Sequence, residues 1–208
     1  MEIKRLNIGL CAKPCAGKGT FVEQCRMVTT AQQLSFLHVR FSDVLRDIAA
    51  LLSIPDTREN LQTLAKRSID DVFGEGTFSN AVNARLAKAR EDVVVIDGVR
   101  WLSDETMLRK LPGYTRIIYI HSSVDDRFKR SCARGENSGE LEKTFEEFLK
   151  EDSASNEAFI EKIGSRAHIR IDNNGTRDSD RAAYAEKARL TAYALIRPLF
   201  FPKEPFSF

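Results

Sequence analysis

The chain has 208 residues, of which 42% are hydrophobic and 30% are charged, and its formal net charge is +2. This composition excludes a disordered or fibrous chain, and the small net charge argues neither for nor against a polyanionic partner. The length fits one domain with inserted segments. No apolar stretch is long enough to span a membrane and the N-terminus lacks a signal-peptide core, so we expect a cytoplasmic protein without membrane contact.

Short apolar runs alternate with longer segments of helical periodicity, which is typical of a parallel α/β sheet covered by helices. We expect strands at residues 5–11, 36–41, 92–97, 115–120 and 167–171. We expect helices at residues 18–32, 43–53, 57–73, 77–90, 103–110, 124–133, 143–162 and 179–196. The run 93–96 is apolar without alternation, so it should be a central strand that is buried on both faces.

The segment 12–20 reads Ala-Lys-Pro-Cys-Ala-Gly-Lys-Gly-Thr and stands between the first expected strand and the first expected helix. A strand, a loop of small residues ending in Gly-Lys and a helix together form a phosphate-binding P-loop. Backbone N–H groups and the helix N-terminus wrap a polyphosphate there, and the lysine adds a positive charge. The residues that we expect to bind the phosphates of ATP are Pro14, Cys15, Ala16, Gly17, Lys18, Gly19 and Thr20.

Asp97 ends the most hydrophobic expected strand, at the sheet edge where a P-loop lies. An acid at this place is suited to organise Mg²⁺. Gly19 stands where the general P-loop pattern has a Ser or Thr. We therefore expect Thr20 and Asp97 to hold the metal through water.

Two further clusters of charge follow strands. Asp43 and Arg46 lie one turn apart, so they can face one cleft, and a surface ion pair is the alternative. Arg130 and Arg134 share one helix face, and arginine forks suit phosphoryl oxygens. The alternative for this pair is a solvated basic face that neighbouring aspartates balance. After the last strand, residues 172–176 form an Asn/Gly turn.

These motifs resemble those of known nucleotide kinases. Gly-Lys-Gly-Thr, with Pro at the third loop position, is similar to the loop of adenylate kinases, although Ala12 and Cys15 replace two glycines that are usual there. The segment 97–100, Asp-Gly-Val-Arg, resembles one in deoxynucleotide and dephospho-coenzyme A kinases. The segment 41–46 is similar to the one whose arginine holds the acceptor monophosphate. The chain therefore resembles the nucleoside monophosphate kinase-like family over about residues 5–196.

The resemblance implies a three-layer α/β/α P-loop fold with a five-stranded parallel sheet, a helical acceptor-binding insertion and a lid. It divides one domain into a core (1–41, 91–121 and 165–196), the insertion (42–90), the lid (122–164) and a Phe/Pro-rich tail (197–208). The tail carries four Phe and three Pro, so we expect no regular helix there. We expect the tail to lie extended against its own domain or against a second copy in a homodimer.

The same resemblance implies ATP as the phosphoryl donor, Mg²⁺ as the cofactor and a role for each motif. The catalytic residues would be Lys18, Asp97, Arg130 and Arg134. The acceptor would be held by Asp43, Arg46 and Arg100, and the adenine of ATP would contact Asn174 and Gly175.

The acceptor itself stays open between several classes. Phosphate-binding arginines favour a (deoxy)nucleoside monophosphate, and dephospho-coenzyme A is a competitor. A modified base or hydroxyl in DNA is a third class, which the net charge does not indicate. Basic residues that could line a DNA groove are Arg58, Lys66, Arg67, Arg85, Lys88 and Arg90, and neighbouring acids offset them. A nucleotide-binding sensor without turnover is the alternative outside the enzymes.

Overall fold

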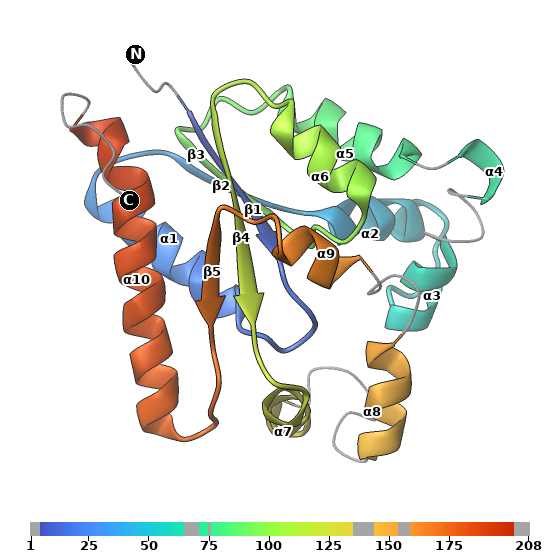
Figure 1. Cartoon of the computed structure of the whole chain (residues 1–208). Helices are drawn as coiled ribbons and strands as arrows, with labels where there is room; N and C mark the ends of the chain where they lie inside the picture. The colour runs from blue at the N-terminus through green and yellow to red at the C-terminus, as the bar shows by residue number, and fades with distance from the viewer. Residues whose placement is uncertain (1–4, 65–70, 75, 135–143, 154–158, 202–208) are drawn as a thin grey trace.

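The computed structural model describes residues 5–64, 71–74, 76–134, 144–153 and 159–201, and its strands form one five-stranded sheet. The strand order is β2-β3-β1-β4-β5, and all four neighbouring pairs are parallel (Figure 1). The five strands are β1 (Leu6–Cys11), β2 (Phe36–Arg40), β3 (Val93–Asp97), β4 (Tyr114–His121) and β5 (Ile169–Asp172). The predicted strands are thus confirmed, with small shifts at their ends.

The central strands are covered on both faces, as their sequence predicts. All four residues of the run 93–96 have an exposed fraction of 0%. In the sheet register Asp97 stands beside Leu10 of β1 and Arg40 of β2. Because the strands are parallel, their carboxyl ends meet at one edge, and the loop after β1 lies at this edge.

Helices cover both faces of the sheet, which gives three layers. Helices α1 (Lys18–Ala31) and α10 (Asp178–Phe200) pack together on one face. Helices α5 (Thr77–Leu86), α6 (Leu102–Arg109) and α9 (Ile160–Gly164) cover the other (Figure 1). This is the predicted α/β/α arrangement.

The segments predicted as insertion and lid also supply helices that pack against the sheet. Helices α2 (Phe41–Leu51), α3 (Arg58–Thr63) and α4 (Asp71–Phe73) follow β2, and α7 (Val124–Arg134) and α8 (Phe145–Asp152) follow β4. The buried side chains of Leu86 in α5 and Ile160 in α9 join the same core cluster as Ile96 of β3. Part of each predicted segment therefore belongs to the layer over the sheet.

One long helix over 143–162 was predicted, and this prediction was wrong. The Thr144 side chain caps α8 by accepting a hydrogen bond from the N–H of Glu147, and the helix ends at Asp152. Ser153 follows in a turn, and α9 begins only at Ile160. Serine competes with the helical backbone through its own side chain, which favours an end at this point.

The prediction that residues 197–208 contain no regular helix was wrong for their first part. Helix α10 continues to Phe200 with Pro198 in its last turn. A proline so close to the end removes few helical hydrogen bonds, and the Phe200 ring packs 5.9 Å from that of Tyr193. Residues 202–208 lie outside the described part of the chain. Among the described residues, no helix has the length and apolarity needed to cross a bilayer.

Candidate active site

The loop between β1 and α1 contains two residues with positive φ angles, Cys15 and Gly17. Gly17 has a φ of +110°, and a Cβ added there would lie 2.4 Å from Nδ2 of Asn173. Cys15 has a φ of +59° without being glycine, so its conformation is strained. Ala12 is absent from the described positive-φ residues and is buried in the core, so replacing the usual glycine there strains nothing.

Three side chains from distant segments hold the loop carbonyl groups from outside. The guanidinium of Arg130 donates to Cys15 O at 3.3 Å, and Asn173 Nδ2 donates to Ala16 O at 2.8 Å. The Tyr184 hydroxyl of α10 donates to Gly17 O at 2.9 Å. In a trans peptide the next N–H points away from the carbonyl, so the N–H groups of Gly17 and Lys18 point away from the Asn173 and Tyr184 contacts, whereas the N–H of Ala16 donates to Lys13 O at 3.3 Å. The start of α1 adds its own N–H groups, which makes an anion site.

Lys18 and Asp97 lie together at this edge of the sheet. The Lys18 Nζ donates to Ala12 O at 3.4 Å. Burial alone raises the pKa of Asp97, but the charges of Lys18, His38 and Arg100 together lower it below its ordinary value. Asp97 is therefore ionised at the edge of the sheet where the loop lies.

The surroundings of Asp97 fit a hydrated magnesium ion. Its Oδ1 is buried without a hydrogen-bond partner among the described residues, and His38 Nε2 lies 3.8 Å from its other oxygen. Thr20 is exposed in the first turn of α1, and a Cβ added at Gly19 would meet nothing within 4 Å. A carboxylate and an exposed hydroxyl are oxygen ligands of the kind that Mg²⁺ takes together with several waters.

The turn after β5 is tied to the loop and to α7. Arg130 donates to the backbone oxygens of Asn173 and Gly175, both at 2.7 Å. The N–H of Gly175 donates to Asp126 Oδ2 at 2.7 Å, and the side chain of Asn174 accepts from the N–H of Ser123 at 2.9 Å. The structure thus brings the predicted adenine-binding residues beside the phosphate loop. Arg134 ends α7, and its side chain lies outside what the structure describes.

The two segments predicted to hold the acceptor lie next to each other. A Cβ added at Gly98 would be 3.8 Å from that of Phe41, the first residue of α2. Asp43 accepts from the backbone N–H of Arg40 at 2.8 Å, so it caps the helix. Arg46 donates to Ser42 and pairs with Asp56 at 3.3 Å. Asp43 and Arg46 thus have different partners in this structure.

A buried acid fixes the backbone around Arg100. Asp104 of α6 accepts hydrogen bonds from the N–H groups of Arg100 and Trp101, each at 2.9 Å. Its other oxygen accepts from Ser79 at 2.6 Å, and burial raises the pKa of Asp104. Sequence reasoning did not single out Asp104, although an acid at the third helical position is a known capping signal.

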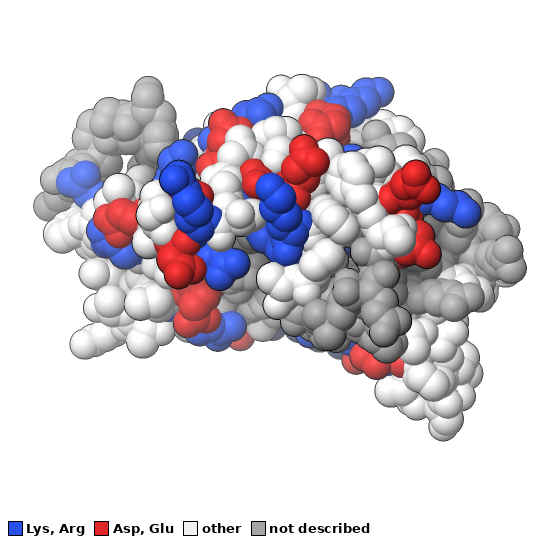
Figure 2. All heavy atoms as spheres, turned by 90° about the horizontal axis from the view of Figure 1, so that it is seen from below, with Lys and Arg blue, Asp and Glu red and all other residues white. Residues whose placement is uncertain are grey.

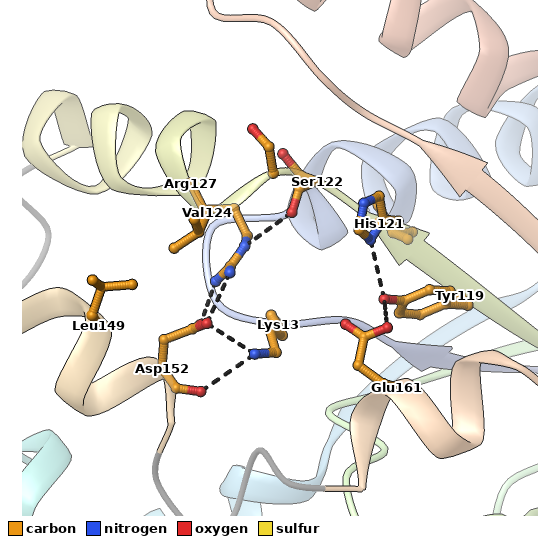
Figure 3. A pocket seen from close by; sticks show the side chains of 11 residues that line it. Lys13, Tyr119, His121, Ser122, Val124, Arg127, Leu149, Asp152 and Glu161 are labelled. Atoms are coloured by element: carbon orange, nitrogen blue, oxygen red, sulfur yellow. Dashed lines mark hydrogen bonds and ion pairs between the residues drawn. The ribbon is translucent and has the colours of Figure 1, made fainter.

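A cavity of about 280 Å³ opens beside the loop, between β4, α7, α8 and α9 (Figure 3). On one side Lys13 Nζ contacts Asp152 Oδ2 at 2.9 Å, and Arg127 Nη2 contacts the same carboxylate at 2.9 Å. On the other side the Tyr119 hydroxyl donates to Glu161 at 2.8 Å. Sequence reasoning assigned no function to these residues, because their contacts depend on how α8 and α9 return to the sheet.

Comparison with known proteins identifies the family. The family described as AAA domain matches residues 12–150, which is more than half of the chain. The chain belongs to the AAA domain family. This AAA domain is 29% identical over 148 residues to a UPF0200 protein of Hyperthermus butylicus, covering 71% of the chain and 74% of that protein. It is 32% identical over 129 residues to a UPF0200 protein of Methanoregula boonei, covering 61% and 66% respectively.

A solved structure shares the fold of this AAA domain. The shikimate kinase from Bacteroides thetaiotaomicron matches it with a TM-score of 0.57 and 16% identity, over 92% of this chain and 98% of that one. At this identity the likeness shows the fold alone, which is the α/β fold of P-loop kinases. The predicted fold class and the resemblance to the fold of a P-loop kinase are thus confirmed.

The surface around the site mixes both signs of charge. Figure 2 shows the molecule from the side on which the carboxyl ends of the strands lie, and basic and acidic side chains alternate there. Arg85, one of the residues considered for a DNA groove, pairs with Asp47. Lys66 and Arg67 lie outside the described residues, as does the side chain of Arg58. This face of the molecule therefore adds no support for DNA.

Proposed function

We propose that this AAA domain is a kinase that transfers the γ-phosphoryl group of ATP to an oxygen of a nucleotide-type acceptor. The observation that carries the proposal is the loop whose carbonyl groups are held outward, with Lys18 beside the ionised Asp97. In the reaction, the bond from the γ-phosphorus to the β–γ bridging oxygen breaks and a bond to the acceptor oxygen forms. ADP leaves with the bridging oxygen.

The phosphoryl donor, ATP, binds at the loop between β1 and α1. Backbone groups of residues 14–20 wrap the phosphates, Lys18 contacts the β- and γ-phosphates, and Asn174 with Gly175 lies against the adenine. Thr20 and Asp97 hold Mg²⁺ through water. When bound, Mg²⁺ neutralises phosphate charge and orients the transferring group.

Arg130 and Arg134 of α7 have different proposed roles. Arg130 donates to the loop and to the turn after β5. We assign it the positioning of the loop against the adenine-binding turn. Arg134 lies one turn further along α7, and it is the candidate for contact with the transferring phosphoryl group.

The acceptor side supports a (deoxy)nucleoside monophosphate. Arg46 and Arg100 come from adjacent segments at the carboxyl edge of the sheet. Guanidinium groups bind phosphate oxygens in a forked geometry, so two of them favour an acceptor that carries a phosphate. Dephospho-coenzyme A also carries phosphate, and only an assay distinguishes the two.

The test is a transfer assay with γ-labelled ATP against mononucleotides, dephospho-coenzyme A, and modified and unmodified oligonucleotides. We expect label on a mononucleotide, and an acceptor KM that rises about tenfold in Arg46→Met or Arg100→Met. The KM for ATP should stay unchanged in both. Arg189→Met is the matched control, because Arg189 is an exposed α10 residue that pairs with Glu186.

Other outcomes of this assay identify the alternatives. Label on oligonucleotides, falling steeply as salt rises, would support action on DNA. Tight ATP binding with no label on any acceptor would support a sensor and contradict the proposed transfer.

A further inference from the structure

Two basic side chains from different segments meet at one carboxylate beside the loop (Figure 3). Asp152 of α8 contacts Lys13 of the loop and both terminal nitrogens of Arg127 of α7. The side chains of Arg127, Asp152 and Lys13 have exposed fractions of 4%, 10% and 22%. Lys13 is thus the most exposed member of the cluster and the one that belongs to the loop.

The cluster has two cations for one anion, so Lys13 can leave without leaving a buried charge unpaired. Arg127 grips both oxygens of Asp152 in a bidentate pair, which is the stronger geometry. Burial alone raises the pKa of Asp152, but Arg127 and Lys13 together lower it, so the carboxylate is ionised. If another anion attracts Lys13, Asp152 keeps its partner Arg127.

A nucleoside triphosphate in the loop would supply such an anion. The Lys18 Nζ donates to the carbonyl of Ala12, the residue directly before Lys13. In a P-loop this lysine reaches the β- and γ-phosphates. Lys13 thus follows directly on the residue that Lys18 contacts, and ATP carries a γ-phosphate at this end of the loop whereas ADP does not.

We propose that Lys13 is a specificity-determining residue that exchanges Asp152 for the γ-phosphate and thereby selects ATP over ADP. This inference rests on the proposed function, since it needs ATP in the loop. Lys13 would then be a second phosphate-binding lysine of the loop, beside Lys18. Asp152 would bind Lys13 while no nucleoside triphosphate is present.

The test is the affinity of the whole protein for ATP and for ADP, measured by calorimetry without acceptor. In Lys13→Met the ATP affinity should fall about tenfold, the size of one charge-assisted hydrogen bond, while the ADP affinity stays within about twofold. Asp152→Asn removes the competing charge, so ATP affinity should rise severalfold and ADP affinity should not. Lys150→Met on the exposed side of α8 is the matched control and should bind both nucleotides as the wild type does.

Each result decides the inference. An ATP-to-ADP affinity ratio that Lys13→Met leaves unchanged would overturn it, including the case in which both affinities fall equally through a structural effect. Circular dichroism melting of each variant identifies such a structural effect. A wild-type protein that binds neither nucleotide would contradict the proposed function as well, whereas normal ATP binding with an unchanged ratio would overturn this inference alone.

Discussion

The strained backbone at Cys15 is the clearest local departure in the loop. Its φ of +59° lies in the left-handed region, which costs a non-glycine residue roughly 1–2 kcal/mol. The resemblance to nucleotide kinases already marked this position, because glycine is usual there. The same reasoning marked Ala12, and the structure shows that this second replacement has no backbone consequence.

Replacing Cys15 by glycine should therefore stabilise the protein. We expect Cys15→Gly to raise the free energy of unfolding by about 0.5–1 kcal/mol, the relieved strain less the extra entropy of glycine in the unfolded chain. Urea denaturation measures this. Ala16→Gly is the matched control: Ala16 has no positive φ and is buried, so this change should destabilise. An equal loss of stability in both variants would refute the strain.

Helix α6 shows how one element positions a site segment. The carboxylate of Asp104 accepts three hydrogen bonds, from the backbone of Arg100 and Trp101 and from Ser79. The conformation of the turn that carries Arg100 therefore depends on hydrogen bonds to the buried side chain of Asp104.

Removing this carboxylate should act on stability and on the acceptor together. We expect Asp104→Ala to lower the free energy of unfolding by about 2–3 kcal/mol, because buried donors are left unsatisfied. The acceptor KM should rise and the KM for ATP should not, since the turn bears Arg100 and not the loop. Asp125→Ala, at an exposed site in the first turn of α7, is the control. A normal acceptor KM in Asp104→Ala would contradict the positioning role.

Among the helices and strands, those that follow from hydrophobic periodicity could be predicted from the sequence. Helix ends that depend on tertiary contacts could not. The strands and α1 follow from apolar runs and from the P-loop motif. The break after Asp152 and the continuation of α10 through Pro198 depend on capping and on packing against the core. Both features lie beyond a local pattern.

The whole molecule brings four distant segments to the carboxyl edge of one sheet. These segments are 12–18, 97–100, 127–130 and 173–175. Their meeting could be predicted, because strands of a parallel sheet end at the same edge. The partners of Arg130, Lys13 and Asp152 could not, because each contact joins residues far apart in sequence whose side-chain directions only the packed structure sets.

Low pH should lower the folding stability, in part by protonating Asp152. Its folded pKa lies below the ordinary 3.8, so the stability it contributes is full above that value and is lost as the pH falls through the lower folded pKa. We therefore expect the Tm of Asp152→Asn to fall less than that of the wild type between about pH 5 and pH 3. Melting curves at each pH measure this, and parallel acid profiles would refute the ionised cluster.

The central claim is that the loop of residues 12–20 is the donor site of a kinase. It is tested most directly by the rate of transfer from γ-labelled ATP to the pooled acceptors, for the wild type and for Lys18→Ala. We predict a loss of at least about a hundredfold with an unchanged far-UV spectrum, because the proposed role of Lys18 is to stabilise charge in the transition state and Lys18 is not one of the buried core residues. Transfer by Lys18→Ala at the wild-type rate would contradict the account.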